Sequence, residues 1–305
     1  MRPAGHLDIG PLRFALRTDG PGSMRYSDPA YGGFFTASAG RTVPVSRALA
    51  EMPVDIVRRA ETLSAGDPLW QAGGHWAAWE DGADLVFHVG LQAPDSMRYS
   101  CRVARDLSRA ELAIPPAAEM GPVLESPLRY PLDQMLSWGL LSRIGGALMH
   151  AAVAVKDGAG WVFTGRSGAG KSTISSLLLA EGYRILNDDR AMVFRRGGEW
   201  RVAGTPWHGS GRFAEADEAP LGGIYFLQKA ADCRGESMPA AQARMSLLDV
   251  AAVPWFEDAW AQGTLDGLDR LARGIEIRRF HFTKTPAAVR ALANDQEFQR
   301  SGVCA

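Results

Sequence analysis

The sequence predicts an α/β protein in which a β-rich N-terminal part precedes a C-terminal part organised around a phosphate-binding loop. Strand-length apolar runs separated by turn residues fill residues 1 to about 120. The short apolar run Gly160–Thr164 leads into Gly165–Ser172, which matches G-x-x-x-x-G-K-[ST] at every fixed position. From Ser246 onward the pattern is mostly helical. We therefore expect two domains, at residues 1–120 and 121–305.

Length and composition agree with a globular chain and exclude several classes. The 305 residues exceed the usual size of one domain, and 46% of them are hydrophobic. A formal net charge of −1 favours neither nucleic acid nor an acidic membrane as partner. No apolar run approaches the roughly 18 residues that span a bilayer, and the N-terminus lacks an apolar leader segment. We expect a cytoplasmic protein. The sequence leaves the oligomeric state open, with a homo-oligomer as one alternative.

The three cysteines give no sign of a structural framework. Cys101, Cys233 and Cys304 are scattered, and none belongs to a C-x-x-C pair or a His/Cys cluster. Neither a disulfide scaffold nor a zinc site is expected.

The N-terminal part is predicted mainly from strand patterns. Leu12–Leu16 alternates apolar and polar residues, and Asp84–Val89 reads as a buried strand. A proline-punctuated stretch from Ile114 to Pro127 predicts a linker.

The C-terminal part alternates strands and helices. An i, i+4 stripe predicts a helix that opens at Pro131 and ends around Gly145 to Met149; its residues are Leu132, Leu136, Leu140, Ile144 and Leu148. The remaining expected elements are strands at 150–155, 160–164, 183–187, 222–227 and 275–281, a hairpin of 191–196 with 199–204 turned by Gly197-Gly198, and helices after the loop and near 286–292.

The loop residues suit a nucleoside triphosphate. Glycines allow successive backbone N–H groups to approach phosphate oxygens closely. The ammonium of Lys171 can reach the β- and γ-phosphates, and the hydroxyl of Ser172 can bind Mg²⁺. The following helix turns its positive end toward the same anion. The expected nucleotide-binding residues are Gly165, Ser167, Gly168, Ala169, Gly170, Lys171, Ser172 and Thr173.

Two adjacent carboxylates follow the next expected strand. Asp188 and Asp189 come directly after residues 183–187, where ligands gather in open α/β sheets. One carboxylate can hold Mg²⁺ while the other deprotonates an incoming hydroxyl. His150, at the start of a neighbouring strand, can hydrogen-bond an aspartate or a phosphate, or be structural. The Gly-rich loop Thr205–Arg212, with His208 and Arg212, is either a substrate clamp or a plain surface loop.

These motifs resemble the catalytic domain of the HPr serine kinase/phosphorylase family, over roughly residues 122 to 292. The resemblance rests on Met149-His-Ala, the loop, and Leu186-Asn-Asp-Asp189. HPr-kinase-related proteins encoded beside ribosomal-peptide and PqqD-type gene clusters are more similar still, since they share a Gly-Thr-Pro-Trp loop and a segment like Ala219-Pro-Leu221. Members of the HPr kinase family usually have an acidic residue where this chain has Thr173.

The resemblance implies a phosphoenolpyruvate-carboxykinase-like P-loop fold with a mixed sheet, after a smaller β-rich α+β domain. It implies that Lys171 contacts phosphate, Ser172 the metal, Asp188 is the base, Asp189 helps to hold Mg²⁺, and His150 supports the pair.

The implied activity is an ATP- and Mg²⁺-dependent kinase acting on a serine-type hydroxyl of a peptide or small protein, with acceptor recognition by the N-terminal domain. Two alternatives stay open: a kinase of a free small molecule such as serine, and a non-catalytic nucleotide-sensing module. A sensor needs a metal ligand but no second carboxylate placed as a base.

Overall fold

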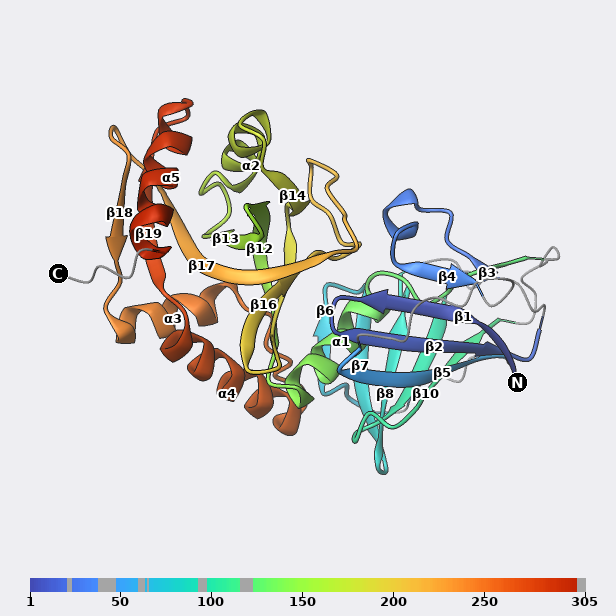
Figure 1. Cartoon of the computed structure of the whole chain (residues 1–305). Helices are drawn as coiled ribbons and strands as arrows, with labels where there is room; N and C mark the ends of the chain where they lie inside the picture. The colour runs from blue at the N-terminus through green and yellow to red at the C-terminus, as the bar shows by residue number, and fades with distance from the viewer. Residues whose placement is uncertain are drawn as a thin grey trace. The chain divides into compact units, whose positions relative to one another are not determined.

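The computed structural model describes residues 1–20, 24–37, 48–59, 64, 66–92, 98–115 and 123–300. These form two compact units, drawn in Figure 1. The first comprises Met1–Leu140 and Pro254–Asp258, and the second comprises Leu141–Val253 and Ala259–Ala305. The expected boundary between residues 120 and 121, like half of the expected linker, lies outside the described residues.

The first unit is built on a nine-stranded sheet, as its alternating sequence patterns predict. Within β2 the buried side chains of Leu12, Phe14 and Leu16 alternate with half-buried ones. The sheet is antiparallel except at β5, which runs parallel to both of its neighbours. In order across the sheet, the strands are β4 (Phe35–Ala37), β1 (Arg2–Ile9), β2 (Leu12–Thr18), β5 (Ala50–Arg58), β10 (Ala110–Ile114), β9 (Tyr99–Ala104), β8 (Asp84–Val89), β7 (Trp76–Asp81) and β6 (Trp70–Ala72).

Smaller elements complete this unit. A parallel pair of two-residue strands, β3 (Met24–Arg25) and β11 (Leu124–Glu125), lies apart from the large sheet. A 3₁₀ turn, η1, spans Pro29–Tyr31. The expected helix appears as α1 (Leu132–Arg143), whose last residues belong to the second unit. It ends earlier than expected, because Gly145 adopts φ +67° and Leu148 lies in the following strand, Ala147–Lys156, and not in the helix.

Within its described residues, the second unit contains the predicted phosphate loop, Gly165–Ser172, together with eight strands and four helices. The strands are β12 (Ala147–Lys156), β13 (Ala159–Thr164), β14 (Arg184–Asn187), β15 (Arg190–Arg196), β16 (Glu199–Ala203), β17 (Glu218–Lys229), β18 (Arg234–Ser237) and β19 (Ile277–Phe282). The helices are α2 (Lys171–Ala180), α3 (Ala240–Val250), α4 (Asp258–Gly274) and α5 (Ala287–Arg300). The expected strands, hairpin and post-loop helix are all present.

Two long strands, β12 and β17, each pair with different neighbours along their length. The first half of β12 pairs with β15 and the second half with β13 and β14. The first three residues of β17 pair antiparallel with β16, and the residues from Leu221 onward pair parallel with β13 and β19. The strand that feeds the loop, β13, therefore lies between one antiparallel and one parallel neighbour. The mixed sheet and the α/β class agree with the sequence-based expectation.

The pairing also fixes where a ligand can collect. Both β13 and β14 run antiparallel to β12, so they point the same way as β17 and β19. The carboxyl ends of these four strands therefore share one edge of the sheet, where ligands of α/β proteins gather.

Each face of this sheet is covered by helices. Along β13, Val162 packs into a core that includes residues of α3 and α4. Its neighbours Trp161 and Phe163 face the opposite core, which includes residues of α2 and α5. Figure 1 shows these two helix pairs in the second unit. The loop strand is thus buried on both faces and holds the loop rigidly.

Helix α2 ends at the glycine that the sequence analysis of helix signals would select, Gly182. Gly182 adopts φ +80°, the Gly182 N–H donates to Leu179 O, and the Tyr183 N–H donates to Leu178 O. This is the Schellman pattern of a helix end.

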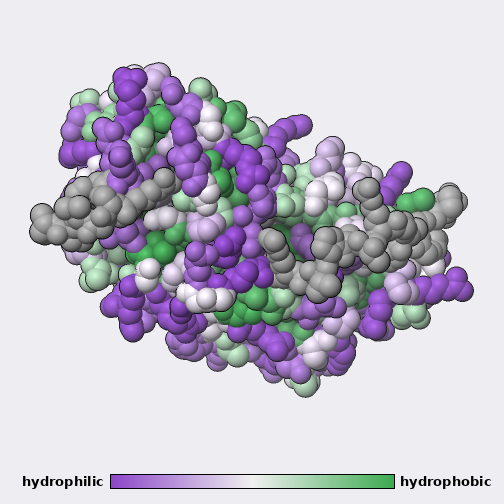
Figure 2. Space-filling model, in the orientation of Figure 1, coloured by the Kyte–Doolittle hydropathy of each residue, from purple (hydrophilic) through white to green (hydrophobic). Residues whose placement is uncertain are grey.

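No helix within the described residues has both the length and the apolar composition needed to cross a membrane. Hydrophilic residues are spread over the face of the molecule seen in Figure 2.

Candidate functional site

The loop between β13 and α2 has a backbone that requires glycine at several places. Gly165, Gly168 and Gly170 adopt φ values of +147°, +78° and +112°. A Cβ on Gly165 would lie 2.9 Å from the Ala169 side chain, and one on Gly170 would lie 2.6 Å from the Phe282 ring. The glycines therefore provide both the left-handed turns and the close packing that turn the loop back onto α2.

Lys171, the first residue of α2, lies at the inner wall of this loop. Its side chain is buried, and its Nζ atom lies 3.4 Å from the carbonyl oxygen of Gly165. Burial lowers the pKa of the ammonium, against the opposing effect of the nearby Asp189 carboxylate. An anion bound at the loop would stabilise the charged ammonium and so oppose the effect of burial on its pKa.

Asp188 follows β14 and is almost fully buried, with 3% of its surface exposed. Its Oδ1 accepts a hydrogen bond from the Gly209 N–H at 2.8 Å, and its Oδ2 accepts one from the Gly211 N–H at 2.6 Å. A Cβ on either glycine would lie within 2.9 Å of Oδ2. Asp188 therefore anchors the tip of the loop that follows β16, and this contact requires glycine at both positions.

Asp189 makes a different set of contacts. Its Oδ1 lies 3.0 Å from Nε2 of His150, and its Oδ2 lies 2.9 Å from Nη1 of Arg190. Burial acts to raise the pKa of this carboxyl, but the hydrogen bond from His150 and the charge of Arg190 outweigh it, so the pKa is lowered. Asp189 is consequently held ionised beside an imidazole.

The turn that separates the two aspartates is shaped by Asn187, which belongs to the quoted Leu186–Asp189 motif but was assigned no role there. Its Oδ1 accepts from the N–H groups of Asp189 and Arg190 at 2.7 and 2.6 Å. Its Nδ2 lies 2.9 Å from the Thr205 carbonyl oxygen. The fully buried amide thus ties the Asp188-Asp189 turn to the start of the loop that Asp188 anchors.

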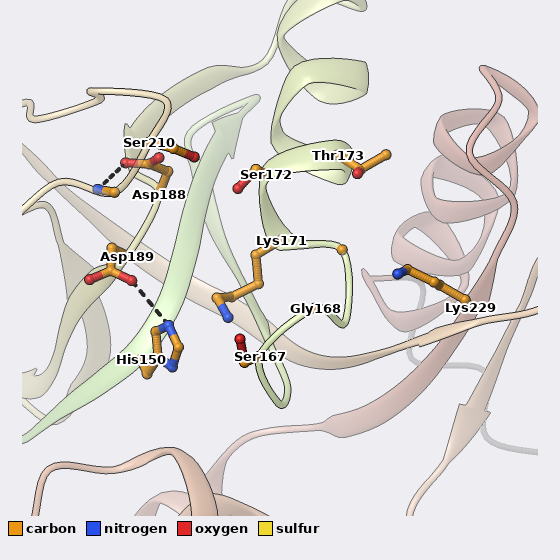
Figure 3. Close-up of a pocket in the computed structure, with 12 residues that line it drawn as sticks. His150, Ser167, Gly168, Lys171, Ser172, Thr173, Asp188, Asp189, Ser210 and Lys229 are labelled. Atoms are coloured by element: carbon orange, nitrogen blue, oxygen red, sulfur yellow. Dashed lines mark hydrogen bonds and ion pairs between the residues drawn. The ribbon is translucent and has the colours of Figure 1, made fainter.

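These side chains border one pocket of about 390 Å³ at the shared carboxyl edge of β13, β14 and β17. Its lining comprises His150, Ser167, Gly168, Gly170, Lys171, Ser172, Thr173, Asp188, Asp189, Gly209, Ser210 and Lys229. Figure 3 shows His150 and Asp189 on one wall and Lys229 beyond the phosphate loop. Of the expected site residues, only Gly165 and Ala169 do not border the pocket; both lie in the loop itself.

Three lining residues were not expected as site residues. Gly209 and Ser210 belong to the Thr205–Arg212 loop, whose glycines were the available signal. Lys229 is the last residue of β17, and the rule that ligands meet strand ends would have found it.

The other two candidates of this loop, His208 and Arg212, do not line the pocket. The Nδ1 atom of His208 lies 2.9 Å from the Gly209 carbonyl oxygen, and Arg212 adopts φ +58°.

The oxygen groups present suit a magnesium ion bound together with phosphate. Ser172 offers a hydroxyl, and the two aspartates offer carboxylates, in the same pocket. Across the described residues, no three His, Cys, Asp or Glu side chains are grouped so as to hold a metal by themselves. Mg²⁺ commonly binds in this way, through one or two carboxylates completed by phosphate oxygens and water.

Comparisons with known proteins give partial matches. The family model described as SynChlorMet cassette protein ScmC matches residues 135–283, just under half of the chain. A solved structure, described as the Hpr(Ser) kinase/phosphatase from Coxiella burnetii, is 16% identical and matches 51% of this chain and 99% of its own, with a TM-score of 0.31. A TM-score this low does not carry a fold assignment. No curated protein sequence matches.

Proposed function

We propose that this chain is an ATP- and Mg²⁺-dependent kinase that transfers the γ-phosphate to a serine-type hydroxyl of a peptide or small protein. The observation that supports this best is the convergence of a phosphate loop, a buried lysine and an aspartate pair on one pocket. A phosphoryl-transfer site requires groups that hold the phosphates and a carboxylate that accepts the proton of the attacking hydroxyl. The P-loop domain is proposed to be of the phosphoenolpyruvate-carboxykinase-like type.

On this proposal the loop and α2 bind the donor. The N–H groups of residues 165–173 and the Lys171 ammonium hold the phosphates. The hydroxyl of Ser172 and one aspartate hold Mg²⁺, which offsets phosphate charge when bound. Because the site lies at the end of strands that are buried on both faces, its groups are held in place before the substrate arrives.

The contacts of the two aspartates favour a division of roles opposite to the one that the family resemblance implies. Asp188 is almost fully buried, and a backbone N–H fixes each of its oxygens, which suits a stationary metal ligand. Asp189 is more exposed and is hydrogen-bonded to His150, a titratable group that can share a proton. We therefore assign proton acceptance to Asp189 with His150, and metal binding to Asp188 with Ser172.

Phosphate transfer from labelled ATP is the direct test. The protein is incubated with Mg²⁺, labelled ATP and either a peptide pool or free serine, and the labelled product is located by mass spectrometry. Label on a peptide serine supports the proposal, and label on free serine supports the small-molecule alternative. ATP binding without any transfer would favour the nucleotide-sensing module.

Lys171→Ala tests whether the loop binds the phosphates of the donor. The variant should lose transfer and weaken triphosphate binding more than diphosphate binding, since the ammonium is assigned to the β- and γ-phosphates. Lys284→Ala is the matched control, because Lys284 is exposed and lies outside the pocket. Wild-type transfer by a folded Lys171→Ala variant would refute the assignment.

A further inference from the structure

A serine of the chain itself lies inside the pocket. Ser210 is exposed and lines the pocket with Lys171, Ser172 and both aspartates. Its hydroxyl has no hydrogen-bond partner within the part of the chain that the structure describes. Figure 3 shows Ser210 beside Asp188, with its oxygen on the side of the pocket where Ser172 lies. A free hydroxyl therefore faces the groups assigned to phosphoryl transfer.

The backbone on both sides of Ser210 is fixed by the site. The N–H groups of Gly209 and Gly211 donate to the two oxygens of Asp188 at 2.8 and 2.6 Å. The serine between them is thus presented at a defined place by the same carboxylate that is assigned to the metal. A hydroxyl held near its reaction partner needs little further ordering to react.

The other two serines of the pocket are placed differently. Ser167 belongs to the phosphate loop and Ser172 to the first turn of α2, so both lie on the nucleotide-binding side. Ser210 comes from a separate loop, after β16. Of the three, it lies where an acceptor would approach.

We propose that Ser210 is an intramolecular phosphate acceptor, a proposal that rests on the kinase function proposed above. The Ser210 Oγ atom forms a bond to the γ-phosphorus of ATP while the bond from that phosphorus to the β,γ-bridging oxygen breaks. ADP leaves with the electron pair of the broken bond, and the hydroxyl proton passes to the carboxylate of Asp189, the assigned proton acceptor. Atoms and charges balance with ATP as the only co-reactant.

The product would oppose further nucleotide binding. A phosphoserine carries a charge of about −1.5 to −2 at neutral pH. At position 210 this charge would lie beside Asp188, in a pocket that must also accept a triphosphate. Phosphorylation of Ser210 therefore limits the activity of the same chain.

Phosphosite mapping tests the acceptor directly. Wild-type protein is incubated with Mg²⁺ and ATP without added acceptor, digested and analysed by mass spectrometry. One phosphoryl group on the peptide that contains Ser210, absent from Ser210→Ala and still present in Ser108→Ala, is the expected result. Ser108 is an exposed serine of the first unit and serves as the matched control.

A mixing experiment tests whether transfer is intramolecular. Lys171→Ala protein, labelled with heavy isotopes, is mixed with wild-type protein and ATP. Phosphate is expected only on light Ser210 peptides, at a fractional rate independent of protein concentration. Equal phosphate on heavy peptides would overturn the intramolecular assignment.

Transfer to an added acceptor and nucleotide binding together distinguish modification of Ser210 from the kinase function itself. A protein that transfers phosphate to an added acceptor but leaves Ser210 unmodified overturns the inference alone. A protein that binds no nucleotide overturns both.

A binding measurement gives a readout that is independent of catalysis. Ser210→Glu should bind ATP about fivefold more weakly than the uncharged control Ser210→Gln, because like charges repel in a partly closed site. Equal affinities of the two variants would overturn the self-limiting role.

Discussion

The imidazole of His150 hydrogen-bonds to the second aspartate of the pair and not to the first: its Nε2 atom lies 3.0 Å from Oδ1 of Asp189. Asp188, the preceding residue, instead accepts hydrogen bonds from two backbone N–H groups. Adjacent residues of the same type therefore have separate surroundings, one a proton-sharing pair and the other a rigid anchor. Catalysis that uses two carboxylates commonly depends on such a difference.

The ionised state of Asp189 should contribute stability that depends on pH. Because its pKa is lowered in the folded chain, the contribution is fully present above the ordinary carboxyl pKa of about 4 and is lost as the pH falls through the lowered folded value. Asp189→Asn should therefore be less stable than wild type near neutral pH, and the difference should shrink in acid. Urea unfolding of both proteins across this range, without nucleotide, measures it. A difference that grows on acidification would contradict the pairing.

The two aspartates should separate by metal dependence. Asp189→Asn removes the assigned proton acceptor, so transfer should fall by about 10² to 10⁴ while the Mg²⁺ requirement changes little. Asp188→Asn should raise the Mg²⁺ concentration needed for half-maximal activity, because a neutral amide is a poorer ligand for a hard cation.

Titrating Mg²⁺ for each variant decides between the two assignments. If only Asp189→Asn shifts the metal requirement, the division implied by the family resemblance is the correct one. Asp266→Asn is the control, since Asp266 is an exposed residue of α4.

Local motifs account for what the sequence predicted of this site. The phosphate loop is a continuous segment whose glycines, lysine and serine determine its own backbone, and Gly182 ends the following helix within a few residues. The strand before the loop was recognisable because it is buried on both faces and carries the apolar run Trp161–Phe163.

Long-range contacts account for what it did not predict. Asn187 acts through Thr205, and Ser210 reaches the pocket because Asp188 binds the backbone on both of its sides. Neither contact leaves a periodic pattern or a characteristic residue spacing in the sequence by which it could be predicted. The pairing of β12 with different strands at its two ends likewise cannot be predicted from its sequence, which is apolar on both sides of His150.

Lys229 should influence nucleotide binding more than turnover. It lines the pocket at the end of β17, and its ammonium has no acidic partner among the described residues. Lys229→Met keeps much of the side-chain volume and removes the charge. We expect the KM for ATP to rise about fivefold, the effect of one charge contact in a partly solvated site, with a smaller change in kcat. Lys284→Met is the control, and a change confined to kcat would place Lys229 at the transferred phosphate instead.

Two glycines of the phosphate loop should differ in how they tolerate a methyl group. Both Gly168 and Gly170 have positive φ, so Gly168→Ala and Gly170→Ala each incur a backbone cost of about 1–2 kcal/mol. A Cβ on Gly168 meets open space, whereas one on Gly170 lies 2.6 Å from the Phe282 ring, an overlap that costs a further 1–3 kcal/mol or so. Urea unfolding without nucleotide should therefore show the larger loss for Gly170→Ala. Equal losses would mean that the Phe282 ring moves aside; in that case Phe282→Leu would leave the Gly170→Ala loss unchanged, whereas a rigid ring predicts that Phe282→Leu relieves it.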